Sequence, residues 1–173
     1  CCAVNLLLTS CVRQKYVVMD MVHHNPGEAM TESKFLDPSF LKKNEYGAKV
    51  FFLFEAAQFG IDWKSFDPSL FPDTTEAGRW VAEKAEIIHK KYDAAKKEDL
   101  QVYCMLDMLV LPSLLVEKHR TELTNEQGKL DISKPYTQLC IRELMKEMFE
   151  TFPQLDGLVI RTGETYLHDA PYY

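Results

Sequence analysis

The chain has 173 residues, of which 46% are hydrophobic and 27% are charged, with a formal net charge of −6 and a pI near 5.4. This is the composition of a globular domain large enough to bury a core, and it excludes disordered and collagen-like chains. Because binding to a phosphate backbone needs a concentrated basic face, the acidic balance also argues against a nucleic-acid partner.

The first residues do not share the pattern of the rest of the chain. Residues 1–8 form an apolar stretch too short to span a bilayer, and Leu8-Thr9-Ser10-Cys11 has the small residues typical of a processing site. These four residues resemble the lipobox of bacterial lipoproteins, which implies lipidation of Cys11. Residues 1–11 would then be a signal segment of an exported protein, held on the membrane in the periplasm or at the cell surface. The alternative is a strand or helix start that carries a cysteine.

The two cysteines outside that segment, Cys104 and Cys140, have no spacing typical of a disulfide framework, and the chain has no Cys-x-x-Cys pair. We expect both to be small buried hydrophobic residues.

Four apolar segments are predicted to be strands, at residues 16–22, 48–54, 100–106 and 155–160. Helices are expected over residues 38–45 with Asp37 as cap, after a capping box formed by Asp73 and Glu76, and from Pro135 to the stop at Pro153. A long loop over residues 58–72 is rich in aromatic residues, which suit stacking on sugar faces.

Strands that alternate with helices predict parallel pairing with right-handed crossovers. Two sheets fit, an open doubly wound sheet and the first half of a TIM (β/α)8 barrel. We favour the barrel because polar side chains follow the strands, while no glycine-rich phosphate loop does. Since a full barrel needs about 250 residues, residues 12–173 are expected to be its amino-terminal half, truncated at the C-terminus. The polar side chains in question are Asp20, His23, Glu55, Asp107 and Glu164.

The last strand carries the most specific signal. The stretch from Leu155 to Glu164, introduced by Phe152-Pro153, resembles the fourth-strand region of (β/α)8 glycoside hydrolases. In that family a Glu at this strand end commonly serves as acid/base, which implies this role for Glu164 in a hydrolase that needs no cofactor. The large retaining clan has Asn-Glu where this chain has Gly163-Glu164, so the stereochemical outcome stays open.

Glycoside hydrolysis needs a second carboxyl group as nucleophile or base. Asp107 and Glu55 are the candidates within the chain, although Asp107 could equally bind a sugar hydroxyl and the partner could lie beyond Tyr173. Arg161 would contact the substrate or pair with a neighbouring carboxylate. The remaining residues that we expect to contact a carbohydrate substrate are Asp20, His23, His24 and Trp63.

Two other function classes stay open. His23, His24 and Asn25, with His168 and Asp169, could hold a metal ion that activates water, although no recognised ligand spacing is present and we expect no metal. The third class is a surface protein that binds carbohydrate without turnover.

Overall fold

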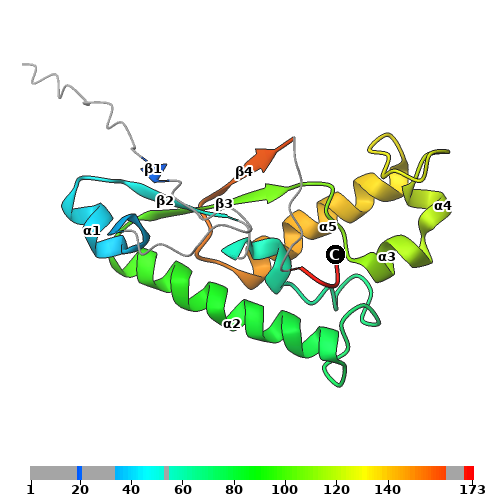
Figure 1. Cartoon of the computed structure of the whole chain (residues 1–173), viewed down its shortest axis with the longest axis horizontal. Coiled ribbons are helices and arrows are strands. Elements are labelled where there is room, and N and C mark those ends of the chain that lie inside the picture. Colours follow the sequence, from blue (N-terminus) through cyan, green and yellow to red (C-terminus); the bar gives the residue numbers. More distant parts are fainter. Residues whose placement is uncertain (1–18, 21–33, 53–54, 163–169) are drawn as a thin grey trace, which may run out of the picture.

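The computed structural model describes residues 19–20, 34–52, 55–162 and 170–173, which form a mixed α/β structure around a small parallel sheet (Figure 1). The sheet has four strands in the order β1-β2-β3-β4, and every neighbouring pair is parallel. The strands are β1 (Met19–Asp20), β2 (Ala48–Phe51), β3 (Gln101–Asp107) and β4 (Gly157–Arg161). The predicted parallel pairing is therefore confirmed for these strands.

Helices and short 3-10 turns connect the strands. A 3-10 turn η1 (Lys34–Leu36) and helix α1 (Pro38–Lys43) precede β2, and η3 (Ala57–Gly60) and α2 (Glu76–Lys97) join β2 to β3. Helices α3 (Ser113–Lys118), α4 (Arg120–Leu123) and α5 (Pro135–Thr151) join β3 to β4. The helices predicted at α1, α2 and α5 are confirmed, whereas α3 and α4 were not predicted.

The two faces of the sheet differ in burial. Along β3 the side chains of Val102, Cys104 and Leu106 are buried and lie in the hydrophobic core, while the alternating Tyr103, Met105 and Asp107 are only half-buried. Successive strand residues point to opposite faces. We call the first set, together with Phe51 of β2, the helix-covered face, and the other the opposite face.

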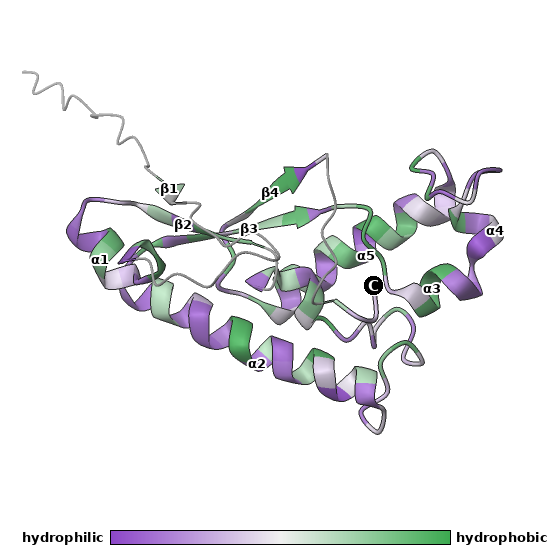
Figure 2. Cartoon of the chain, in the orientation of Figure 1, coloured by the Kyte–Doolittle hydropathy of each residue, from purple (hydrophilic) through white to green (hydrophobic). Residues whose placement is uncertain are grey.

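Helices α2 and α5 both pack on the helix-covered face. The Phe51 ring lies 4.7 Å from the ring of Tyr92 on α2, and Tyr92 lies 5.7 Å from Phe152, which directly follows α5. The buried residues of α2 recur at helical spacing, while hydrophilic residues occupy much of its remaining surface (Figure 2). The amphipathic pattern of this helix thus fixes which side of the sheet it covers.

The predicted N-cap residue is confirmed for α1 and is wrong for α2. Asp37 caps α1, and its Oδ1 accepts a hydrogen bond from the Ser39 backbone N–H at 2.9 Å. At α2 the cap is Thr75, whose Oγ1 accepts from the Gly78 N–H at 3.0 Å. The helix thus begins two residues later than expected, and the predicted cap Asp73 pairs with Lys64 at 2.9 Å.

The two cysteines are buried and free, as predicted. Burial raises the pKa of both thiols to about 11. Because the thiolate is the reactive form, we expect iodoacetamide at pH 7.5 to leave Cys104 and Cys140 unmodified in the folded protein and to alkylate both in urea. Peptide mapping by mass spectrometry measures this, with a short cysteine peptide in the same tube as control. Alkylation of either residue at the rate of the control peptide would contradict the burial.

Asp67 ties the loop after η3 to helix α3. Its carboxylate accepts from the Ser69 hydroxyl at 2.5 Å and pairs with Lys118 at 3.0 Å. The hydrogen bond from the Ser69 hydroxyl lowers the pKa of Asp67 most, and Lys118 lowers it further, to about 2.

A carboxyl group with a lowered pKa in the folded state stabilises the protein above its unfolded pKa, and this stabilisation is lost as the pH falls through the folded pKa. Asp67→Asn should therefore lower the free energy of unfolding at pH 7 by about 1 kcal/mol or less, since the pair is partly solvated. The difference from wild type should shrink between pH 4 and pH 2. Urea denaturation across this pH range tests it, and an unchanged difference at all pH values would rule out the assignment.

Candidate functional site

Asp107 and Arg161 form the most defined polar cluster at the carboxyl end of the sheet. They are the last residues of β3 and β4 and lie directly opposite each other in the strand register. Arg161 Nε donates to Asp107 Oδ1 at 2.6 Å, and an Arg161 Nη donates to Oδ2 at 2.7 Å. The side chains are only 21% and 13% exposed, so this bidentate pair is largely withdrawn from water. From the sequence we expected Arg161 either to contact the substrate or to pair with a neighbouring carboxylate. The structure shows the ion pair.

Phe52 adds an aromatic surface from the neighbouring strand. It directly follows β2, and its ring centroid lies 5.0 Å from the guanidinium carbon of Arg161. A cation held over an aromatic face at this distance is electrostatically favourable. The ends of three adjacent strands therefore contribute a ring, a carboxylate and a guanidinium to one place on the opposite face.

Gln58 of η3 lies beside this cluster. Its side chain is buried, and its Oε1 makes no hydrogen bond within the part of the chain that the structure describes. Gln58, Phe52 and Asp107 are among the residues that line a cavity of about 10 Å³, which is too small for a sugar ring.

Glu55 is not brought to this cluster. Its carboxylate pairs with Lys91 of α2, and its backbone carbonyl accepts from the Tyr92 hydroxyl at 2.9 Å. It also lines a shallow cavity with Phe51, on the helix-covered side of the sheet. The structure therefore places Glu55 and Asp107, the two candidates for the second carboxylate, on different sides.

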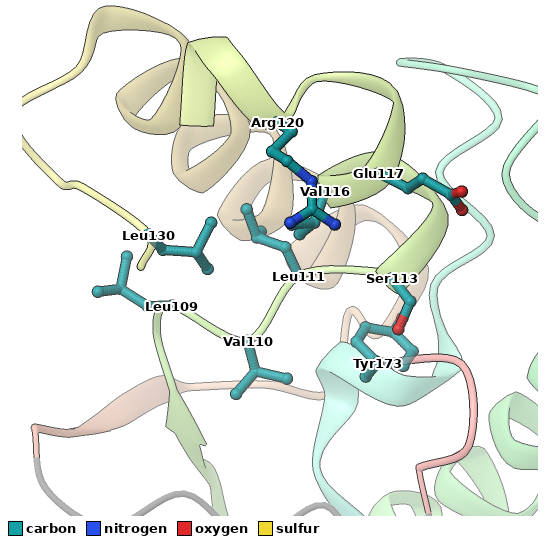
Figure 3. A pocket seen from close by; sticks show the side chains of 9 residues that line it. All are labelled: Leu109, Val110, Leu111, Ser113, Val116, Glu117, Arg120, Leu130 and Tyr173. Carbon is teal, nitrogen blue, oxygen red and sulfur yellow. The ribbon is translucent and has the colours of Figure 1, made fainter. Parts of the chain in front are cut away.

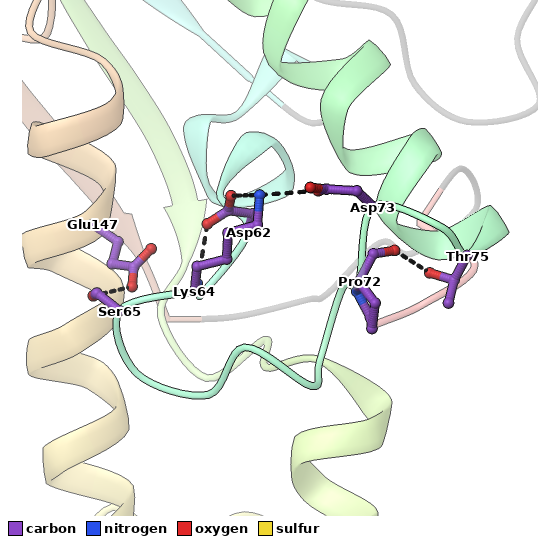
Figure 4. A network of polar contacts seen from close by, with 7 residues as sticks. All are labelled: Asp62, Lys64, Ser65, Pro72, Asp73, Thr75 and Glu147. Atoms are coloured by element: carbon purple, nitrogen blue, oxygen red, sulfur yellow. Dashed lines mark hydrogen bonds and ion pairs between the residues drawn. The ribbon is translucent and has the colours of Figure 1, made fainter.

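Trp63 is fully buried, which corrects the expectation that its ring contacts a sugar. Its exposed fraction is 0%, and it packs at 6.0 Å from Phe66 within the loop after η3. The same loop is held by ion pairs of Lys64 with Asp62 and Asp73, and by the Ser65 hydroxyl, which donates to Glu147 of α5 at 2.5 Å (Figure 4). The aromatic loop thus packs against the hydrophobic core and covers it.

Asp20 lies away from the carboxyl edge. The register aligns it with Lys49, which is aligned with Val102, five residues before Asp107 along β3. At about 3.3 Å per strand residue, this separates the Asp20 and Asp107 positions by about 16 Å along the sheet. The expected substrate contact by Asp20 is therefore not supported by the register.

The other predicted site residues lie outside the described residues. They are the acid/base Glu164, the substrate contacts His23 and His24, and the lipidation residue Cys11. Among the described residues there is no group of three or more side chains suited to hold a metal ion. No helix in the described ranges is long and apolar enough to cross a membrane.

Sequence reasoning did not single out Phe52 or Gln58. A usable signal existed for Phe52, because alternation along β2 places it on the face opposite to Phe51. No signal marked Gln58, since η3 is buried by tertiary packing against α2 and α5.

Comparison with models of known protein families, with curated proteins and with solved structures finds no match.

Proposed function

We propose that this chain supplies the first four strands of a (β/α)8 domain and that it hydrolyses glycosidic bonds at the carboxyl ends of those strands. Glu164 is the general acid/base in this proposal. The observation that carries it is the placement of Asp107 and Arg161 at the ends of β3 and β4, with Glu164 three residues after Arg161 in the chain. In parallel α/β folds, ligands bind at this end of the strands.

The strand order supports the barrel over the doubly wound sheet. An open doubly wound sheet reverses its strand order at a switch point and carries helices on both faces. The described strands run in sequence order, and α2 and α5 both pack on the helix-covered face. A barrel built from right-handed crossovers has this arrangement, with its helices outside the strands.

Asp107 is better suited to position substrate than to donate the proton. Both of its oxygens already accept hydrogen bonds from Arg161, so it is held in one orientation as part of a planar ion pair. Such a pair can still offer a carboxylate lone pair to a sugar hydroxyl. Glu164 would protonate the leaving oxygen. The second carboxylate is not Glu55 in this proposal, because Glu55 pairs with Lys91.

A panel of 4-methylumbelliferyl glycosides tests this function by fluorescence release. We expect turnover of at least one sugar and insensitivity to EDTA. On an unactivated disaccharide of that sugar, Glu164→Gln should lose about 10²–10⁴-fold in kcat/KM, the usual contribution of general acid/base catalysis. Glu126→Gln, in the exposed loop between α4 and α5, is the matched control and should retain full activity.

The outcomes separate the three function classes. Sugar binding without turnover by the wild type would favour the non-catalytic carbohydrate-binding class. Loss of turnover with EDTA would favour a metal-dependent hydrolase. Full activity of Glu164→Gln would remove Glu164 from the mechanism.

A further inference from the structure

A separate groove of about 510 Å³ lies beyond the carboxyl end of β3 (Figure 3). Residues 109–111, Val116 of α3, Leu130 and Tyr173 supply its apolar walls. This volume is within the range of small-molecule binding sites, roughly 300–1,000 Å³. None of these residues belongs to the Asp107–Arg161 cluster.

The walls of the groove are fixed by hydrogen bonds from several parts of the chain. The Val110 N–H donates to the Asp107 carbonyl at 3.0 Å, which turns the segment after β3. The Ser113 N–H donates to the Tyr172 carbonyl at 2.8 Å, and the Tyr173 hydroxyl donates to the Gln58 carbonyl at 2.9 Å. Val110 and Leu111 are buried, whereas Leu109 is 38% exposed. The groove is thus a formed feature, and Leu109 is the most exposed of its apolar walls.

Arg120 gives the groove its polarity. It is the first residue of α4, and its guanidinium points toward Leu111 and Val116, while the carboxylate of Glu117 points away from Leu109 and Leu130 (Figure 3). Within the described part of the chain, the Arg120 side chain makes no hydrogen bond or ion pair. A guanidinium beside apolar walls matches a planar carboxylate, which accepts two parallel N–H bonds.

We propose that this groove binds a small apolar molecule with a single carboxylate, of the aryl or short-chain carboxylic acid class. The carboxylate pairs with Arg120, and the apolar body lies against residues 109–111 and Leu130. The site is independent of the glycosidase proposal, because it needs neither Glu164 nor a sugar.

Isothermal titration calorimetry with two matched probes tests the site. The probes are 2-naphthoate and 2-naphthalenemethanol, which share an apolar body and differ in the carboxylate. The wild type should bind 2-naphthoate about threefold to fivefold more tightly, the size expected for a partly exposed ion pair. Arg120→Gln should remove this preference, whereas Arg142→Gln, an exposed arginine on α5 that does not line the groove, should keep it.

A second variant tests the apolar wall. Leu109→Ala should weaken both probes by about twofold to threefold and keep the preference for the carboxylate, because it removes apolar contact only. Absence of saturable binding of 2-naphthoate up to millimolar concentration would overturn the proposal. Equal affinities of both probes, or a preference that survives Arg120→Gln, would overturn the role of Arg120.

Discussion

Replacing Arg161 by methionine should lower the free energy of unfolding by about 2–3 kcal/mol. The change leaves the Asp107 carboxylate largely buried without the two N–H donors that it has at 2.6 and 2.7 Å. Removing one partner of a fully buried ion pair costs about 3–5 kcal/mol, and the residual exposure of this pair reduces the expected loss. Urea denaturation monitored by circular dichroism measures it.

A double variant separates the pair from general packing effects. Asp107→Leu combined with Arg161→Met should recover most of the loss, because an apolar pair of similar volume avoids an unpaired buried charge. Lys90→Met is the control. Lys90 forms a solvent-exposed ion pair with Glu86 on α2, so its replacement should leave the unfolding midpoint unchanged. A double variant as unstable as the sum of its single variants would show that the two residues act separately.

Phe152→Ala should cost about 3–5 kcal/mol, the range for truncating a buried Phe in a core. Phe152 is fully buried where α5 ends, 5.7 Å from Tyr92 and 4.6 Å from His89. Its ring therefore joins the end of α5 to α2 on the helix-covered face. The loss should be visible as a lower urea midpoint with an unchanged m-value.

Phe149 provides the matched control for this substitution. It lies on α5, but its side chain is 40% exposed. Phe149→Ala should therefore lower the free energy of unfolding by less than about 1 kcal/mol. Similar losses for the two variants would mean that the packing of α5 against α2 differs from that described.

The regular elements could be predicted because their patterns are local. A run of apolar residues marks β3, and apolar residues at intervals of three and four mark α5. Helices α3 and α4 were not predicted because they have only six and four residues. Segments of this length are stabilised by tertiary packing, which a sequence pattern does not contain.

The candidate site could be predicted only where strand register decides it. Asp107 and Arg161 end adjacent parallel strands, so their meeting follows from topology. Glu55 lies beyond the regular part of β2, where alternation no longer tells which side a residue faces. For Trp63, the neighbouring sequence does not distinguish a ring that packs in the core from one that stacks on a sugar, because aromatic loops contain both.

The role of Glu164 is tested most directly by the dependence of the reaction on the leaving group. A general acid assists a poor leaving group strongly, whereas a 2,4-dinitrophenolate leaves without protonation. On the sugar that the panel identifies, Glu164→Gln should lose about 10²–10⁴-fold in kcat/KM with an unactivated disaccharide. It should lose little with the 2,4-dinitrophenyl glycoside. Equal losses on both substrates would contradict the proposal that Glu164 donates the proton.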